Sequence, residues 1–154
     1  MAEAATYKAG IVGLGFIGAS DQISGDVLGQ CVKSLDGTHL AALDKNPRIQ
    51  IVAGSSRDQG RRIRFTERTG ARIYSNWLEM LEKEDLDLVS IATYTPVHKE
   101  ITVACAEYRV PAIYCEKPIA SRIADGERML RACQEAGSLL IINHNRRFNP
   151  NYCR

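Results

Sequence analysis

The sequence predicts one α/β domain built on a doubly wound parallel sheet, a Rossmann-like fold. Six short apolar runs alternate with helix-like segments along the 154 residues, which is the pattern of parallel strands joined by helical crossovers. A glycine-rich turn directly follows the first run, as it does in the first crossover of such sheets. No internal repeat or low-complexity tract interrupts the alternation. We therefore expect residues 1–154 to form a single domain.

The predicted strands are short and apolar, as strands buried on both faces of a sheet should be. The first contains Ile11 and Val12, which run into the glycine turn. The others are expected at residues 49–54, 72–74, 86–92, 112–115 and 139–142.

The helices between them are marked by capping residues. Thr38, Asn76 and Ser121 are predicted N-caps, and Gly70 and Gly137 are predicted to end their helices in the left-handed conformation. The predicted helices cover residues 38–43, 57–69, 77–81, 97–108 and 121–136. Pro150 would open a further helix at the end of the sequence.

The segment from Ala19 to Gly37 departs from this regular alternation. It is rich in Asp, Ser and Gly where a helix should follow the glycine turn. We expect a long loop there with at most one helical turn, and such loops inside compact domains are usually functional or mobile.

Composition excludes several classes of protein. The net charge of +2 is too small to indicate a nucleic-acid partner, and no apolar run approaches the ~20 residues of a membrane span. The five cysteines show no C-x-x-C spacing, which argues against disulfides and against a metal site. The N-terminus lacks the features of a signal peptide, so a cytoplasmic location is expected.

The glycine turn has the pattern Gly13-x-Gly15-x-x-Gly18, with Phe16 and Ile17 between the last two glycines. Glycines allow the tight turn, the approach of bare backbone N–H groups to a pyrophosphate, and close packing of the next helix. The turn therefore predicts a dinucleotide site. In an open parallel sheet that site lies beyond the carboxyl ends of the strands, where the sequence places Gly13, Ser56, Thr93, Glu116 and Asn143.

With these elements in order, the chain resembles the N-terminal domain of the Gfo/Idh/MocA oxidoreductases from Tyr7 to Pro150. The resemblance is carried by the glycine turn and three further motifs. These are Ala92-Thr93-Tyr94-Thr95-Pro96-Val97-His98, Glu116-Lys117-Pro118 and Arg146-Arg147-Phe148-Asn149-Pro150. The Glu-Lys-Pro triplet is the most specific of them.

The resemblance implies a hydride transfer between NAD(P) and a sugar, inositol or related polyol. It implies that Lys117 lies between nicotinamide and substrate and orients or protonates the reacting oxygen. Glu116 corresponds to an acidic residue near the nicotinamide ribose, and Arg147 to a position at the substrate end. Residues of the loop beside the cofactor correspond to Thr93, Thr95 and His98.

Three departures from the family pattern qualify this reading. The insertion from Ala19 to Gly37 raises the question of whether Gly18 begins a helix. Ser56 stands where the family often has an acidic residue, and the C-terminal domain with its catalytic Asp and His has no counterpart. By itself the chain is therefore expected to be inactive, and a non-catalytic dinucleotide-binding module is the alternative. The substrate and the oligomeric state, a homo-oligomer included, stay open.

The end of the second strand predicts NADP as the cofactor, with NAD as the alternative. An NAD site places a carboxylate there for the ribose 2′-OH, whereas this chain has Ser56 followed by Arg57. A serine hydroxyl and a guanidinium can both donate to a 2′-phosphate. Asp58 could accept from the 2′-OH instead if the strand ended later than predicted.

Overall fold

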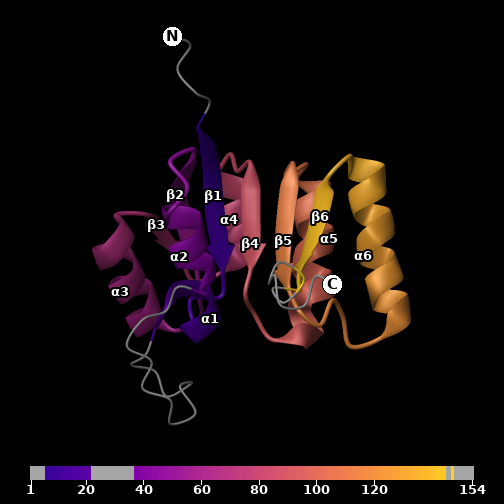
Figure 1. Ribbon diagram of the computed structural model, residues 1–154, viewed down its shortest axis with the longest axis horizontal. Helices are drawn as coiled ribbons and strands as arrows, with labels where there is room; N and C mark the ends of the chain where they lie inside the picture. The colour runs from indigo at the N-terminus through magenta and orange to yellow at the C-terminus, as the bar shows by residue number, and fades with distance from the viewer. Residues whose placement is uncertain (1–5, 22–36, 145–146, 148–154) are drawn as a thin grey trace.

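The computed structural model describes residues 6–21, 37–144 and 147. These residues form a wholly parallel sheet in the order β3-β2-β1-β4-β5-β6 (Figure 1). This is the strand order of doubly wound dinucleotide-binding folds, so the predicted fold class is confirmed. The strands are β1 Tyr7–Val12, β2 Ile49–Ser55, β3 Arg72–Tyr74, β4 Leu88–Ile91, β5 Ala112–Glu116 and β6 Leu139–Asn143.

Helices cover both faces of the sheet, one set on each face. They are α1 Phe16–Ala19, α2 His39–Asp44, α3 Gln59–Thr69, α4 Trp77–Lys83, α5 His98–Glu107 and α6 Ile123–Ala136, with a 3-10 turn, η1, at Thr95–Val97. The first three pack in one core cluster with Ala9 and Ile11 of β1. The last three pack in a second cluster with Val89 and Ile113. This division follows from right-handed crossovers that run outward in opposite directions from β1.

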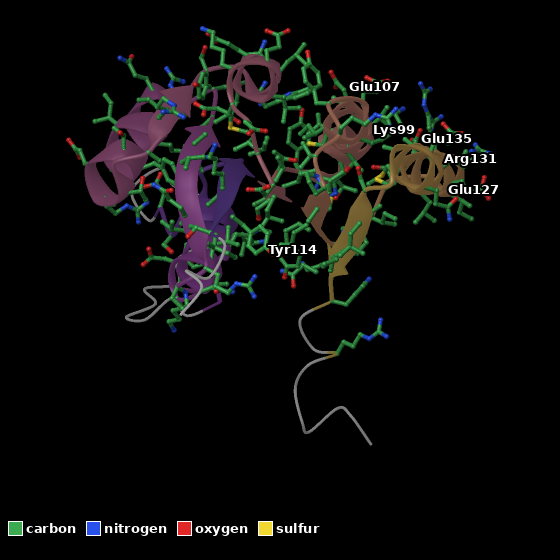
Figure 2. All side chains as sticks on the ribbon, turned by 90° about the horizontal axis from the view of Figure 1, so that it is seen from above. Lys99, Glu107, Tyr114, Glu127, Arg131 and Glu135 are labelled. Carbon is green, nitrogen blue, oxygen red and sulfur yellow. The ribbon has the colours of Figure 1, made fainter. Side chains whose placement is uncertain are left out.

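No helix of the described residues covers the sheet face of β5 and β6 that lies opposite α5 and α6. Tyr114 of β5 lies on the side of the sheet away from the α5 and α6 residues in the view from above (Figure 2). Leu139 and Ile141 of β6 are 59% and 39% exposed. Within the part of the chain that the structure describes, helices cover the apolar runs of β5 and β6 on the α5–α6 face alone.

The first crossover is a helix in two pieces. Helix α1 ends at Ser20, which takes the left-handed conformation, and α2 begins after Thr38, whose side chain caps it by accepting from Ala41 N at 3.3 Å. Between them, Ser20 Oγ lies 2.7 Å from Thr38 Oγ1. The predicted loop from Ala19 to Gly37 therefore leaves and rejoins the fold at nearly one point. Its residues 22–36 lie outside the described residues.

The residues that precede the segment 22–36 are hydrogen-bonded to α3. Arg64 donates to both carboxylate oxygens of Asp21 at 2.9 and 2.8 Å, and Arg68 Nη2 donates to the carbonyl of Ala19 at 2.5 Å. Asp21 is only 4% exposed, so these charge-assisted bonds hold a buried carboxylate. The residues that flank the insertion are thus fixed to the helix that follows β2.

Several predicted boundaries shift. Ser121 is not a cap: α6 begins at Ile123, its N-cap position is Arg122, and no side chain bonds there. Helix α3 begins at Gln59 rather than Arg57, because Asp58 accepts from Arg61 N at 2.8 Å and so caps it. The predicted endings are confirmed, with Gly70 and Gly137 at φ of 70° and 74°. The helix expected at Pro150 lies outside the described residues.

Within the described ranges, no helix combines the length and apolarity needed to cross a membrane. The same ranges contain no cluster of His, Cys, Asp or Glu suited to a metal ion. Cys105, Cys115 and Cys133 are buried, free thiols, and the other two cysteines fall outside those ranges.

Candidate functional site

A cleft of about 790 Å³ opens at the carboxyl ends of β1, β2 and β4. This is the place at which an open parallel sheet binds its ligand, on either side of the point where the strand order reverses. Trp77, Val97 and Ile101 contribute apolar wall to it. The polar and glycine-turn residues that line it are Gly13, Gly15, Ser55, Ser56, Arg57, Asp58, Arg61, Ser75, Thr93 and Tyr94.

The glycine turn forms the floor of the cleft and packs against the end of β4. Gly13 has a φ of +96°, and a Cβ there would lie 2.5 Å from the carbonyl oxygen of Ala92. A Cβ on Gly18 would lie 1.8 Å from the carbonyl oxygen of Gly13. Gly18 therefore lies inside α1, packed on the turn, and the doubt about its place is resolved.

The other residues of the turn belong to the start of α1. Gly15 occupies its N-cap position, and Phe16 and Ile17 are its first residues. Both side chains line the cleft, and Ile17 is 45% exposed. The turn thus brings backbone and apolar side chains together at one end of the cleft.

At the end of β2, the backbone is shaped by Arg62. Its Nη1 donates to the carbonyl oxygens of Ser56 and Arg57 at 2.6 and 2.9 Å. Asp58 uses one carboxylate oxygen to cap α3, and Ser56 Oγ accepts from Asp58 N at 3.3 Å. The exposed side chain of Arg57 is left at the border of the cleft.

At the end of β4, Thr93 and Tyr94 line the cleft. The hydroxyl of Thr93 is buried and has no hydrogen-bond partner among the described residues. Thr95 begins the 3-10 turn that precedes α5. His98, also expected beside the cofactor, is fully buried. Its Nε2 lies 3.0 Å from the carbonyl of Thr93 and its Nδ1 lies 3.0 Å from that of Pro118, so it acts on the cleft only through those loops.

At the end of β5, Glu116 belongs to a buried polar network. Its Oε1 accepts from His39 Nε2 at 2.9 Å and from Asn143 Nδ2 at 2.5 Å. Its Oε2 accepts from the backbone N–H of Lys117 at 3.1 Å. Burial favours the protonated acid, but the bonds from His39 and Asn143 outweigh it and hold the pKa of Glu116 below its usual range.

The side chain of Lys117 takes no part in this network. It is exposed, and no hydrogen bond or ion pair on its Nζ occurs within the described ranges. The ammonium of Lys117 therefore forms no ion pair with the neighbouring carboxylate of Glu116. Arg147 is exposed beyond β6, where its backbone N–H donates to the carbonyl of His144 at 2.8 Å.

Sequence reasoning missed two parts of this site. His39 and Ser90 were assigned to a helix and a strand without a role, yet they lie 2.6 Å apart through Nδ1 and Oγ. Trp77, placed in a predicted helix without a role, packs against the second core cluster and also lines the cleft. The available signal was a histidine at the start of an otherwise apolar predicted helix, and its partners depend on which strands become neighbours.

The cleft fits an extended dinucleotide. It has a glycine turn where added Cβ atoms would collide with backbone, a basic and hydroxyl-bearing edge at β2, an apolar wall, and an orphaned threonine hydroxyl at β4. Fold and site together define a Rossmann-type dinucleotide-binding domain.

The comparisons with known proteins agree. The model of the Gfo/Idh/MocA oxidoreductase family, described as having an NAD-binding Rossmann fold, matches residues 7–144. The chain therefore belongs to this oxidoreductase family.

Three similar proteins can be named. D-apiose dehydrogenase of Paraburkholderia graminis is 36% identical over 113 residues, which cover 73% of this chain and 30% of that protein. Myo-inositol 2-dehydrogenase of Thermotoga maritima is 27% identical over 146 residues, which cover 94% of this chain and 38% of that protein. The crystal structure of the WlbA dehydrogenase of Bordetella pertussis, in complex with NADH and UDP-GlcNAcA, superposes with a TM-score of 0.79 at 25% identity. The match covers 96% of this chain and 40% of that protein. The chain thus spans about a third of the length of these relatives.

Proposed function

We propose that this chain is the cofactor-binding domain of an oxidoreductase that transfers a hydride between NAD(P) and a CH–OH group of a sugar, inositol or related polyol. The observation that carries the proposal is that the glycine turn after β1 lines the cleft, while Lys117, whose Nζ is bonded to none of the described residues, follows β5, two strands along the same sheet edge. The relatives named for D-apiose and myo-inositol support the substrate class. Bound nicotinamide would supply the hydride acceptor or donor.

The residues have distinct roles in this proposal. The turn from Gly13 to Gly18 holds the pyrophosphate through backbone N–H groups. The chain from Thr93 to Thr95 borders the cofactor, and Glu116 offers a fixed carboxylate near the nicotinamide ribose. Lys117 orients or protonates the reacting oxygen, and Arg147 lies at the substrate end.

We further propose a preference for NADP(H) over NAD(H). Ser56 and Arg57 border the cleft where β2 ends, and Asp58 is engaged as the cap of α3. A charge-assisted bond from Arg57 to a 2′-phosphate contributes roughly 1.5–3 kcal/mol, which is about a 10- to 150-fold preference. Since the WlbA relative was solved with NADH, this preference would set the chain apart from it.

Calorimetric titration of the chain with NADPH and NADH tests both statements. Wild type should bind NADPH more tightly, Arg57→Ala should lose that advantage, and Gly15→Val should bind neither. Arg48→Ala is a matched control, because Arg48 stacks on Tyr7 at the opposite end of β1. Equal or tighter binding of NADH by wild type would contradict the cofactor preference, and unchanged affinity in Gly15→Val would contradict the site.

Catalysis is tested in a form of the protein that turns over a sugar or inositol substrate. Lys117→Ala should lower the rate strongly and leave the dissociation constant of the dinucleotide nearly unchanged. A wild-type rate in that variant would remove Lys117 from the mechanism.

A further inference from the structure

Two buried histidines connect the carboxyl ends of β4 and β5, one on each face of the sheet. His39 of α2 lies between Ser90 of β4 and Glu116 of β5, at 2.6 and 2.9 Å. His98 of α5 lies between the carbonyls of Thr93, after β4, and Pro118, after β5, both at 3.0 Å. The two rings are 2% and 0% exposed, and α2 and α5 belong to opposite core clusters.

The hydrogen bonds of His39 follow from the chemistry of its partners. A carboxylate only accepts, so Nε2 carries the proton that is donated to Glu116. In the neutral ring Nδ1 then accepts from the hydroxyl of Ser90, which is itself fully buried. With Asn143 and the N–H of Lys117, three donors hold the Glu116 carboxylate. The backbone at Lys117 is thereby tied to α2.

His98 holds the same backbone from the other side. Both of its partners are carbonyl oxygens, which can only accept. The neutral ring has one N–H, which it donates to the chain after β4 or to the chain after β5, and the other nitrogen packs against the second carbonyl. Pro118 directly follows Lys117, and Thr93 lines the cleft. The residue that bears the exposed ammonium is therefore flanked by two anchored neighbours, Glu116 and Pro118.

We propose that His39 and His98 are positioning residues, a clamp that fixes Lys117 relative to the Thr93 wall of the cleft. This rests on the proposed function, in which Lys117 serves the nicotinamide end. A long lysine side chain places its ammonium only as well as its backbone is held, and a displacement of about 1 Å at a reacting group costs about 100-fold in rate. The clamp provides that rigidity without occupying the cleft.

Matched variants separate the two connections of each ring. Gln places an amide near the Nε2 position of histidine, and Asn places one near Nδ1. His39→Gln thus keeps the donor to Glu116, whereas His39→Asn and His39→Leu lose it. His98→Gln keeps the bond to Thr93, and His98→Asn keeps the bond to Pro118. Tyr74→Phe is the control, because it removes a 2.5 Å bond to another buried carboxylate, that of Glu84, far from Lys117 in the fold.

The first measurement needs no ligand. Amide hydrogen exchange followed by NMR should be about tenfold faster at Lys117 in His39→Leu and His39→Asn, with wild-type exchange in His39→Gln and Tyr74→Phe. Exchange at Lys117 should also rise in His98→Gln. Exchange at Val97, whose N–H donates to the carbonyl of Tyr94 in the chain after β4, should rise in His98→Asn. The amides of β2 and α3 report global stability and should change little.

The second measurement asks whether the clamp serves the nicotinamide half of the cofactor. The affinity for NADPH is compared with that for 2′-phospho-ADP-ribose, which lacks nicotinamide. In His39→Asn and in both His98 variants the ratio of the two affinities should fall about tenfold, with 2′-phospho-ADP-ribose bound as in wild type. His39→Gln should restore the ratio.

If the variants bound NADPH and 2′-phospho-ADP-ribose more weakly by the same factor, or if exchange rose at every amide alike, the histidines would have only a structural role. Either result would overturn the proposal. A ratio within twofold of wild type in folded His39→Asn and His98→Asn would overturn it as well. If wild type bound neither ligand, the proposed function would fail, and unchanged exchange at Lys117 in the folded variants would separately overturn the clamp.

Discussion

Replacing Gly18 with alanine should damage both the fold and the cofactor site. The added Cβ would lie 1.8 Å from the carbonyl oxygen of Gly13 and 3.0 Å from the Cβ of Ala92. The first of these atoms is backbone and cannot rotate away, so α1 must move by more than 1 Å from the turn, because C···O contacts are normally above 3 Å. Overpacking of this kind costs about 1–3 kcal/mol. The better helix propensity of alanine returns at most about 1 kcal/mol.

The expected net loss is therefore about 1–2 kcal/mol, which lowers the Tm of a domain of this size by about 2–8 °C. Urea and thermal unfolding followed by circular dichroism measure it. Dinucleotide binding should weaken as well, because the carbonyl that must move belongs to Gly13 in the floor of the cleft.

Gly126→Ala is the matched control for this prediction. Gly126 is a buried residue of α6, and its new Cβ would meet only two Ile119 methyl groups at 3.7 and 3.8 Å, which is ordinary contact. Alanine there should raise stability by about 0.5–1 kcal/mol and leave binding unchanged. Equal stability of Gly18→Ala and wild type would refute the reasoning, because the close packing of α1 on the turn would then be unnecessary.

Three other predictions concern acid stability, the insertion and the thiols. The hydrogen bond from Arg72 holds the pKa of Glu84 below its ordinary value and outweighs the opposing effect of burial. The ionised carboxylate therefore stabilises the fold above the pKa that Glu84 has in the unfolded chain. This stabilisation is lost as pH falls through the pKa that Glu84 has in the folded chain. Glu84→Gln should thus lose less unfolding free energy than wild type between pH 7 and pH 3 in urea titrations. An equal loss would show that this carboxylate does not contribute to the acid sensitivity of the fold. Replacing residues 22–36 with two glycines should keep the unfolding free energy within about 1 kcal/mol, because the residues that flank the segment lie close together and a shorter loop costs less entropy; failure to fold would show the segment to be structural. Burial raises the pKa of Cys115 to about 12, so iodoacetamide should leave the buried thiols unmodified in the native chain by mass spectrometry, and rapid labelling would show the α5–α6 core to be open. Those thiols are Cys105, Cys115 and Cys133.

The fold could be predicted because its signals are local. Each strand is a short apolar run, and the glycines at positions 70 and 137 end helices through a left-handed conformation that other residues resist. Ser121 failed as a cap because a serine hydroxyl caps only where the chain turns into the helix at that residue. Here the chain stays extended through Arg122, at φ −138° and ψ 147°.

The site was predictable only in part, for a different reason. Residues that follow strands could be placed at one edge of the sheet from the alternation alone, and the turn and the end of β2 do lie in one cleft. The polar network could not be predicted, because His39 and Glu116 are 77 positions apart and meet only through the crossover to β4 and β5. The burial of His98 depends likewise on carbonyls from two separate loops.

The first crossover, with its helix in two parts, should also tolerate the insertion of another protein domain. The facing ends of the two parts meet through side-chain oxygens 2.7 Å apart, and guest domains are best accepted where termini lie close together on the surface. One end is bonded through Asp21 to Arg64 of α3, the helix that begins beside Arg57 at the border of the cleft. A circularly permuted fluorescent protein inserted there would be connected through α3 to the border of the cleft, so that nucleotide binding could change its fluorescence.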